Sequence, residues 1–355
     1  EAEITHLHRM FTLVMDDVRA GHFSPVMILE NQTPVEFSAL PLSCFEGGNY
    51  EHVSYDSVSR LLEDYYASKN TVSRIRQKSV DLRKIVQTAL ERNYKKYDLQ
   101  LKQLKDTEKR DKYKVYGELI HTYGYGLEEG AKKLEALNYY TNEMITIPLD
   151  SQLDAKGNAQ KYFDRYNKLK RTYEALTKLT EETKTEIEHL ESISTALDIA
   201  LTEDDLVQIK EELIEFGYIK RKKTDKKAKI KSKPFHYRSS DGYDIYVGKN
   251  NYQNDELTFK FATGNDWWFH AKGMPGSHVI VKSNNEELPD RVFEEAGMLA
   301  GYFSKGREDE KVEIDYLQKK NVKKPNGAAP GFVVYYTNYS LTIHPDISGL
   351  TLVSD

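Results

Sequence analysis

The sequence contains a single cysteine, Cys44, in 355 residues. One thiol cannot form a disulfide within the chain, so the class of small secreted folds held together by disulfides is excluded. No run approaches the roughly eighteen consecutive apolar residues that a membrane-spanning helix requires. The chain begins at Glu1 inside an expected helix, so we expect a part of a longer protein and give little weight to the lack of a signal peptide.

Hydrophobic residues are also scarce, at 39%, whereas charged residues reach 30%. This balance predicts long solvated helices beside a folded core. The length corresponds to roughly two or three domains. We expect an α+β protein. The single cysteine fits a reducing compartment such as the cytoplasm, although many secreted bacterial proteins also lack cysteine.

Motifs of catalysis and of metal binding are missing. The sequence has no Gly-rich phosphate loop, no paired-cysteine zinc spacing and no HExxH helix. Ser277, His278 and Asp266 are residue types that hydrolases use, but neighbours on a strand point to opposite faces, so His278 cannot readily act as a base for Ser277. His6 and His8 lie on different faces of a helix and are expected at the surface. We expect no catalysis, no cofactor and no metal.

The first fifty residues predict a helix followed by two strands. A helix over residues 1–20, ending at Gly21, is indicated by apolar side chains at helical spacing: Ile4, Leu7, Phe11, Val14 and Val18. Strands are expected at 25–29 and 35–42, on either side of a turn at Asn31-Gln32.

Two long helical runs follow. The first extends from Ser57 to about Lys114 and carries one seam of Leu61, Tyr65, Val72, Ile75, Leu82 and Val86. That seam then slips in phase to Leu90, Tyr94, Tyr97, Leu101 and Leu104, as in a coiled-coil stutter. The second run keeps a 4-3 alternation of Tyr162, Tyr166, Leu169, Tyr173, Leu176, Thr180, Thr183, Ile187, Leu190, Ser194, Leu197 and Leu201. Together they predict an antiparallel coiled-coil arm, roughly 60 to 75 Å long at 1.5 Å per residue.

A folded insert at 115–157 separates the two runs. Helix breaks are expected at Gly117, Gly124, Gly126 and Gly130. A small hairpin is expected from strands at 133–138 and 144–147. Leu134, Leu137, Ile145 and Ile147 are the predicted core of this tip.

Charge is polarised along the predicted arm. Residues 92–114 hold nine basic and four acidic groups, and residues 156–178 hold seven and two, whereas residues 180–215 hold two and twelve. This charge distribution favours contact between RNA phosphates and the basic half of the arm, near the insert. Helices that alternate charge only for solubility could show the same distribution. The candidate phosphate contacts are Lys102, Lys105, Lys109, Arg165, Lys168 and Arg171. Residues 218–234, with nine basic groups and one acidic, are expected to form a basic linker.

Residues 235–355 predict strands at 235–237, 244–247, 267–270, 278–281, 312–316, 332–336 and 340–343, and helices at 255–262 and 290–304. The adjacent Trp267 and Trp268 should point to opposite faces of one strand, so that one packs inside and the other is exposed or covers a neighbouring element. An exposed indole beside polar groups could stack on a base. The predicted RNA-binding surface comprises Asp266, Trp267, Trp268, His270, Lys272, Ser277, His278, Lys319, Lys320, Lys323 and Lys324. A packed hairpin whose histidines merely complete internal hydrogen bonds is the alternative.

The run D-x-W-F-H-A-K-x-x-P-G-S-H-V, at 266–279, resembles the signature of the NFACT-R domain. Residues 248–251, 254–258, 300–304, 323–325 and 330–331 agree with that resemblance. It implies a remnant of the NFACT-N domain at 1–50, the arm at 51–217, the linker at 218–234 and an NFACT-R domain at 235–355. The family's functional Asp-Arg pair would lie upstream of this chain.

The resemblance also implies two kinds of function. Members of the family bind a stalled large ribosomal subunit and tRNA, and support the addition of alanine tails in ribosome quality control. Members in Gram-positive cocci are alternatively described as fibronectin- or fibrinogen-binding adhesins at the cell surface. No tandem fibronectin-binding repeat is visible in the sequence. Both functions concern partners rather than catalysis.

Overall fold

A computed structural model describes residues 2–30, 33–45, 50–221 and 232–353. These residues form long helices and three antiparallel sheets, which agrees with the α+β expectation. The chain divides into two compact units. The first unit contains residues 1–87 and 190–355, and the second contains residues 88–189. The predicted basic linker lies largely outside the described residues.

The first unit begins with helix α1 (Ala2–Ala20) and a sheet of β1 (Val26–Glu30), β2 (Thr33–Ser38) and β3 (Tyr50–Ser54), in the order β2-β1-β3. The predicted turn at 31–32 falls outside the described residues. A short helix, η1 (Ser43–Phe45), carries the exposed Cys44. Helix α2 (Val58–Lys78) packs on the sheet through Leu61 and Tyr65, which cluster with Met27. On α1, the predicted apolar stripe is exposed.

The long helix expected from Ser57 onward consists of three helices: α2, α3 (Val80–Thr107) and α4 (Arg110–Tyr123). Ser57 caps the start, since its side chain accepts a hydrogen bond from the Arg60 N–H. The interruption at Ser79 is slight, because its N–H still donates to the Ile75 carbonyl and its carbonyl accepts from the Arg83 N–H.

Within the second unit, the buried seam of α3 differs from the prediction. Leu90 is buried as expected, but Tyr94 and Leu101 are 43% and 41% exposed. Asn93 and Gln100 are buried in their place. The seam runs through positions 90, 93, 97, 100, 104 and 107, a regular 3-4 spacing that places two amides inside. The prediction was wrong because it followed hydrophobicity rather than this spacing.

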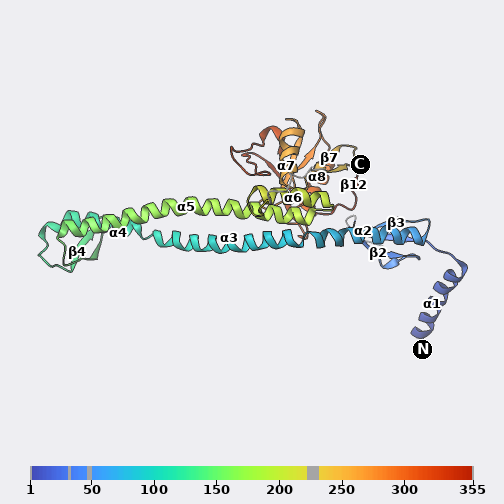
Figure 1. Ribbon diagram of the computed structural model, residues 1–355, viewed down its shortest axis with the longest axis horizontal. Coiled ribbons are helices and arrows are strands. Elements are labelled where there is room, and N and C mark those ends of the chain that lie inside the picture. Colours follow the sequence, from blue (N-terminus) through green and yellow to red (C-terminus); the bar gives the residue numbers. More distant parts are fainter. Residues whose placement is uncertain (1, 31–32, 46–49, 222–231, 354–355) are drawn as a thin grey trace. The chain divides into compact units, whose positions relative to one another are not determined.

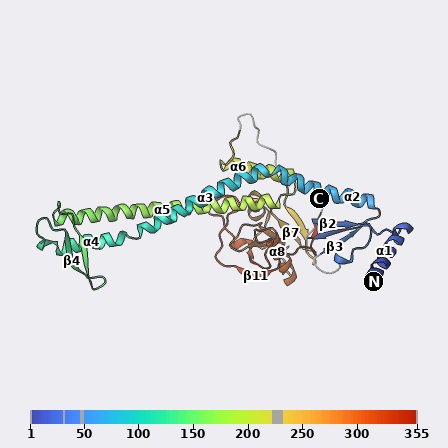
Figure 2. The same ribbon diagram turned by 90° about the horizontal axis from the view of Figure 1, so that it is seen from below.

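The facing helix, α5 (Ala155–Ile199), is continuous over 45 residues. In the second unit its buried positions include Leu176, Thr180, Thr183 and Ile187, which confirms the 4-3 alternation there. Helices α3 and α5 run side by side in this unit (Figures 1 and 2). A coiled-coil arm spanning both units remains a prediction.

The insert contains the hairpin of β4 (Lys133–Asn138) and β5 (Glu143–Pro148), preceded by η2 (Gly124–Gly126). Leu134 and Ile147 belong to its core, but Leu137 is 39% exposed. Side chains of a strand alternate, so Leu137 faces away from the side that holds residues 134 and 136. Gly117 does not break a helix as expected. It lies inside α4, where a Cβ would come within 2.8 Å of the Phe163 ring.

Residues 190–221 of the first unit include the end of α5 and helix α6 (Glu203–Glu215). Helix α6 begins with a reciprocal capping box between Thr202 and Asp205. Leu201, the last position of the predicted seam, lies beyond the end of α5 and is 47% exposed.

The C-terminal part of the first unit is built on a seven-stranded antiparallel sheet in the order β11-β10-β8-β9-β7-β6-β12. The strands are β6 (Phe235–Arg238), β7 (Asp244–Val247), β8 (Trp267–Ala271), β9 (Val279–Val281), β10 (Val312–Gln318), β11 (Tyr339–Ile343) and β12 (Thr351–Leu352). Between them lie α7 (Asn251–Glu256), the π-helical turn η3 (Leu257–Phe261), α8 (Asp290–Tyr302) and η4 (Lys319–Asn321). Below, these elements are called the C-terminal sheet domain.

One predicted strand of this domain, at 332–336, is wrong. The segment makes only an isolated bridge between Lys323 and Val334. Just before this segment, Gly331 has a positive φ of 78°, and its N–H donates to the Asp255 carboxylate. The backbone is thereby held in a loop conformation that a continuing ladder cannot use.

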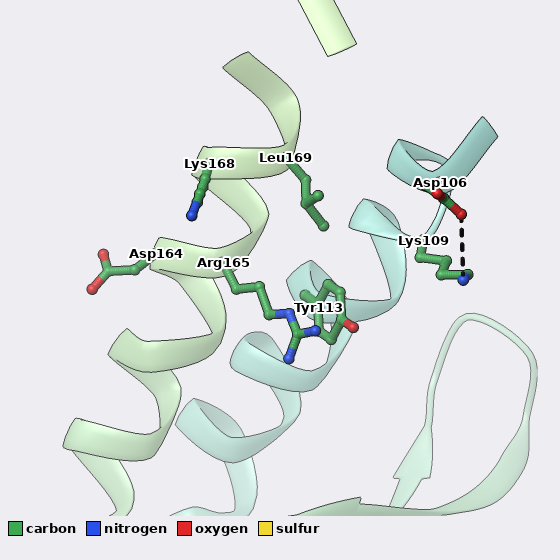
Figure 3. Close-up of a pocket in the computed structure, with 7 residues that line it drawn as sticks. All are labelled: Asp106, Lys109, Tyr113, Asp164, Arg165, Lys168 and Leu169. Atoms are coloured by element: carbon green, nitrogen blue, oxygen red, sulfur yellow. Dashed lines mark ion pairs between the residues drawn. The ribbon is translucent and has the colours of Figure 1, made fainter. Parts of the chain in front are cut away.

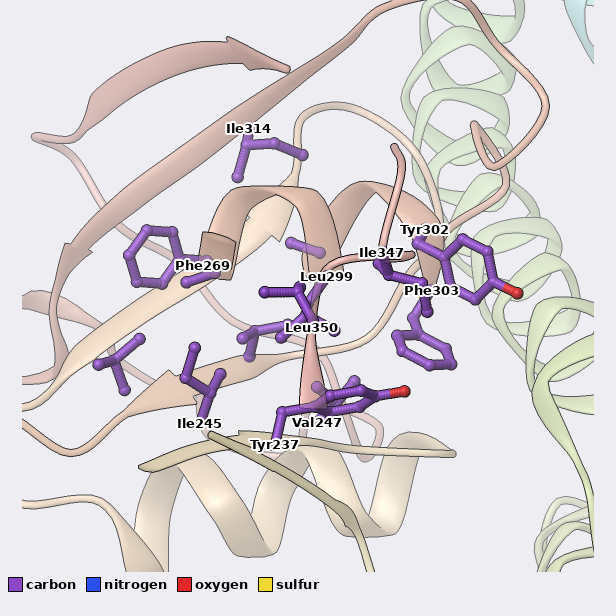
Figure 4. Packing of buried hydrophobic residues seen from close by; sticks show 14 of the residues in the cluster. Tyr237, Ile245, Val247, Phe269, Leu299, Tyr302, Phe303, Ile314, Ile347 and Leu350 are labelled. Carbon is purple, nitrogen blue, oxygen red and sulfur yellow. The ribbon is translucent and has the colours of Figure 1, made fainter. Parts of the chain in front are cut away.

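The two faces of the sheet carry different cores. Helix α8 covers one face, where Phe269, Ile245 and Leu299 belong to the larger apolar cluster (Figure 4). On the opposite face, Trp268 and Ile280 pack with Leu257 and with residues around 317–322. The functional candidates of the signature therefore fall on both faces of one sheet.

Candidate nucleic-acid interface

The two tryptophans point to opposite faces of β8, as predicted. Trp268 is fully buried. Trp267 is half-buried and covers neighbouring elements, with its ring 4.8 Å from Phe293 of α8 and 5.9 Å from Tyr316 of β10. Neither indole is a freely exposed ring.

Asp266 is an internal anchor rather than part of an exposed surface. Its side chain is 2% exposed, forms an ion pair with Lys282 and accepts hydrogen bonds from the Thr263 and Ser283 N–H groups. Burial acts to raise the pKa of this carboxyl, but these hydrogen bonds outweigh it and lower the pKa. Asp266 thus fixes the loops on either side of the β8–β9 hairpin.

Ser277 and His278 are also internal. Each is 1% exposed. Ser277 donates to the Gly248 carbonyl, and the His278 N–H donates to Oδ1 of Asn254. For Asp266, Trp268, Ser277 and His278, the prediction of an exposed RNA-binding surface is therefore wrong. The signature instead encodes hydrogen bonds that hold the hairpin against α7.

His270 and His278 form a pair of neutral rings, with centroids 5.5 Å apart. His270 is partly exposed, and its ring stacks on Trp268 at 5.6 Å. Loss of hydration lowers the pKa of His270 to about 4, against an opposing effect of Asp315. Burial and the neighbouring His270 hold the pKa of His278 well below its ordinary value. Both rings are uncharged at neutral pH and offer no cation to phosphate.

Residues 248–251, which agree with the family pattern, have a clear structural role. A Cβ on Gly248 would lie 2.2 Å from Oδ1 of Asn254, so only glycine fits. The Asn250 amide donates to Gln208 of α6, and the Asn251 amide donates to Glu212 of α6 and to Ser192 of α5. These amides fasten the C-terminal sheet domain to α5 and α6, within the first unit.

The predicted lysines of this domain differ in availability. Lys272 is exposed and paired with Glu313, while Lys324 is paired with Asp255. The Lys319 ammonium lies 5.9 Å over the Phe259 ring. Lys320 and Lys323 are exposed. Lys319, Lys320 and Lys323 are therefore the stronger candidates for phosphate contacts.

In the second unit, the structure brings three of the six predicted phosphate contacts to one open groove (Figure 3). The groove lies between α5 and the junction of α3 with α4, and is lined by Asp106, Lys109, Tyr113, Asp164, Arg165, Lys168 and Leu169. The Arg165 guanidinium lies 4.3 Å over the Tyr113 ring, and Lys109 is 3.8 Å from Asp106. With three basic and two acidic side chains, the groove carries a small positive excess.

Lys102, Lys105 and Arg171 are exposed but do not line the groove. Sequence reasoning missed Arg110, whose guanidinium lies 4.0 Å over the Tyr173 ring. It also missed Tyr113. Both contacts join α4 to α5, so they depend on the pairing of two distant segments.

Within the part of the chain that the structure describes, no group of His, Cys, Asp and Glu side chains is arranged to hold a metal ion. Among the same residues, no helix combines the length and the apolar character needed to cross a membrane.

The protein thus has a mixed α+β fold. The residues of the signature hold the β8–β9 hairpin in the C-terminal sheet domain, and basic side chains lie at the surface. A family model described as NFACT N-terminal and middle domains matches residues 1–232, and one described as NFACT protein RNA binding domain matches residues 233–336. The chain belongs to the NFACT family, which confirms the resemblance seen in the signature.

Named relatives agree. The Rqc2 homolog RqcH of Streptococcus suis is 42% identical over 88% of this chain and 56% of the relative. RqcH of Bacillus subtilis is 36% identical over 82% of this chain and 52% of the relative. The chain therefore spans about half the length of these relatives. A solved structure, the C-terminal part of the fibronectin/fibrinogen-binding protein from Streptococcus suis, superimposes with a TM-score of 0.62 at 39% identity, covering 77% of this chain and 96% of that one.

Proposed function

We propose that this chain is the RNA-binding part of a ribosome quality control factor. The observation that carries the proposal is the match of residues 233–336 to an RNA-binding domain, in a chain whose relatives are named as Rqc2 homologues. The surface is compatible, because Lys320 and Lys323 in the C-terminal sheet domain and the groove of the second unit offer cations to phosphate.

In this proposal the chain is not an enzyme. It binds a large ribosomal subunit that carries a stalled peptidyl-tRNA, and helps to recruit tRNA for alanine tailing while the ribosome forms the peptide bonds. The helices of the second unit act as a coiled-coil arm whose basic half lies against ribosomal RNA, and the C-terminal sheet domain contacts RNA separately. The protein would work in the cytoplasm.

The test reverses all six charges, at Lys102, Lys105, Lys109, Arg165, Lys168 and Arg171, and measures co-sedimentation with large subunits between 50 and 200 mM salt. Loss of phosphate contacts lowers both the affinity and its salt dependence. A control variant reverses Lys132, Lys178 and Lys184, which are exposed in the same unit. If the six-site variant bound like the unmodified chain, the RNA role of this unit would be refuted.

An adhesin is the second candidate, because the solved relative bears the name of a fibronectin/fibrinogen-binding protein. An exposed edge of the C-terminal sheet could add a strand from a fibronectin module. The comparison to make is the affinity of this chain for fibronectin against its affinity for tRNA and large subunits, all at physiological salt. Tighter binding to fibronectin than to either RNA partner would favour the adhesin.

A further inference from the structure

Three rings form a row on the face of the C-terminal sheet that lies opposite α8. His236 on β6 and Tyr246 on β7 are paired across the strands, and their rings stack at 4.5 Å with an angle of 4°. Phe261, the last residue of η3, continues the row at 4.7 Å from Tyr246. We call these three residues the aromatic row.

The aromatic row is more open than the core beside it. Phe261 is 41% exposed, whereas Ile280 on the adjacent strand of the same face is fully buried. The His236 side chain retains 22% of its exposure, and Tyr246 is half-buried. The row is therefore one stacked pair, His236 and Tyr246, followed by Phe261, which meets Tyr246 edge-on at 67° and leaves ring surface open to solvent.

The π-helical turn η3 explains why the row ends in an open ring. The Ala262 N–H donates to the Leu257 carbonyl at 2.8 Å, a wider turn than that of an α-helix. Such turns are frequent at functional sites. The widened turn places Lys260 and Phe261 at the surface, next to the loop that leads to β8, while Phe259 is half-buried against the core of this face.

Cations accompany these rings. The Lys282 ammonium lies 4.9 Å over Phe261, and Lys319 lies 5.9 Å over Phe259. Lys260, between the two phenylalanines, is exposed. Asp266 partly offsets Lys282, and Asp244 accepts hydrogen bonds from His236 and Arg238. The end of the row at η3 is therefore its more positive end.

The exposed Phe261 ring, with the Lys260 and Lys282 ammonium groups beside it, fits one class of ligand: a single strand of nucleic acid, whose bases stack while its phosphates meet the cations. Paired bases in a duplex are already stacked on each other and do not offer their faces. We infer that the aromatic row, with Lys260 and Lys282, binds unpaired nucleotides of RNA. The inference rests on the proposed RNA-binding function and specifies the RNA class and the residues.

The experiment measures the binding of the whole chain to a labelled single-stranded oligouridylate and to an RNA hairpin duplex of equal length, by fluorescence anisotropy. Phe261→Ala should weaken binding to the single strand about tenfold, the loss expected for one stacked base, and leave the duplex affinity unchanged. Phe332→Ala is the matched control, because Phe332 is also 41% exposed but lies outside the row. Phe261→Trp should retain affinity, and its added indole should be quenched by the single strand.

Equal losses on both RNAs, or no loss on either, would overturn the inference while leaving the proposed RNA-binding function intact. An unmodified chain that bound neither RNA nor large subunits would overturn both. If Phe261→Ala reduced the affinity for fibronectin and not for RNA, the row would belong to a protein partner and the inference would be wrong.

Discussion

Two buried carboxylates of the C-terminal sheet domain and one buried amide in the second unit differ in how many hydrogen bonds they make. In the sheet domain, the carboxylate of Asp266 meets an ammonium and two N–H groups, and Asp315 accepts from Tyr335, Asn338 and Ser340. In α3, by contrast, Oε1 of Gln100 is buried and has no hydrogen-bond partner among the described residues.

The difference separates two uses of polarity. Around Asp266 and Asp315 in the sheet domain, complete sets of hydrogen bonds hold the loops and the hairpin in one arrangement. A buried polar atom left without a partner there would lower the stability of the domain. In α3, a buried amide in the helical seam lowers stability, and its only benefit would be to fix the register in which the helices pair. We therefore expect removal of the Asp266 carboxylate to weaken the sheet domain and removal of the Gln100 amide to strengthen the second unit, whereas Asn158 of the second unit is fully hydrogen-bonded and should behave like Asp266.

The largest effect should come from Asp266→Ala, which leaves the Lys282 ammonium and two N–H groups without their acceptor. Loss of one partner of a buried ion pair costs about 3–5 kcal/mol, and partial exposure of Lys282 at 21% favours the lower end. Both tryptophans lie in this domain, so tryptophan fluorescence during urea unfolding reports on it. Asp241→Ala, in an exposed turn, is the control. A loss below about 1 kcal/mol would contradict the anchoring role.

Next in size is the pH dependence that His270 and His278 confer on the same domain. Their folded pKa values are depressed, to about 4 for His270 and well below the ordinary value for His278. The stability they contribute is complete above the unfolded pKa near 6.5 and is lost as pH falls toward the folded values. The unfolding free energy should drop by roughly 1.4 kcal/mol per pH unit for each histidine.

Urea unfolding between pH 6.5 and 5 measures this slope before most carboxylates titrate. The variant His278→Gln should remove about half of it, with His6→Gln as an exposed control. A slope that is the same in all three proteins would show that the paired rings take up protons in the folded state.

A smaller effect of opposite sign is expected from Gln100→Leu in the second unit. Oε1 of this amide is buried without a partner, so replacing the side chain with an apolar one of similar volume should raise stability by about 1 kcal/mol. Thermal unfolding followed by circular dichroism at 222 nm reports on these helices. The neighbour Leu101→Gln is the control, because Leu101 is 41% exposed and should change stability little. Destabilisation by Gln100→Leu would indicate that the amide has a partner.

The smallest effect, one on binding alone, should separate the groove from its surroundings. Reversal of Lys109, Arg165 and Lys168 should reduce the salt slope of RNA binding by roughly two to three, since each phosphate contact accounts for about 0.9. Reversal of Lys102, Lys105 and Arg171 changes the same charge in the same unit outside the groove, and should reduce it less. Equal effects would show that the groove has no special part in binding.

The sequence allowed much of the sheet domain to be predicted. Alternation and turn residues located β6, β7, β8, β10 and α8 to within a few residues, because each strand has one clear apolar period. The opposite orientation of Trp267 and Trp268 followed from the same period. The sequence could not show how deeply each side chain is buried. Nothing in the sequence distinguishes an Asp266 or a His278 that faces solvent from one that bonds to internal partners.

The misses in the second unit have a different origin. Tyr94 and Leu101 were assigned to the seam because they are apolar, yet the helical spacing buries Asn93 and Gln100. The aromatic row could not be predicted either, because His236, Tyr246 and Phe261 come from three segments that strand pairing and a ring contact bring together. Local patterns determine elements, whereas surfaces depend on which distant segments are neighbours.

The amides of Asn250 and Asn251 have a consequence for how relatives of this protein can differ. They fasten the C-terminal sheet domain directly to α5 and α6, and Ser232, in the connecting segment that precedes β6, adds hydrogen bonds to α6 and α7. Insertions and deletions should accumulate in that segment without altering the rest of the first unit, as long as the glycine at position 248 and the two asparagines are kept.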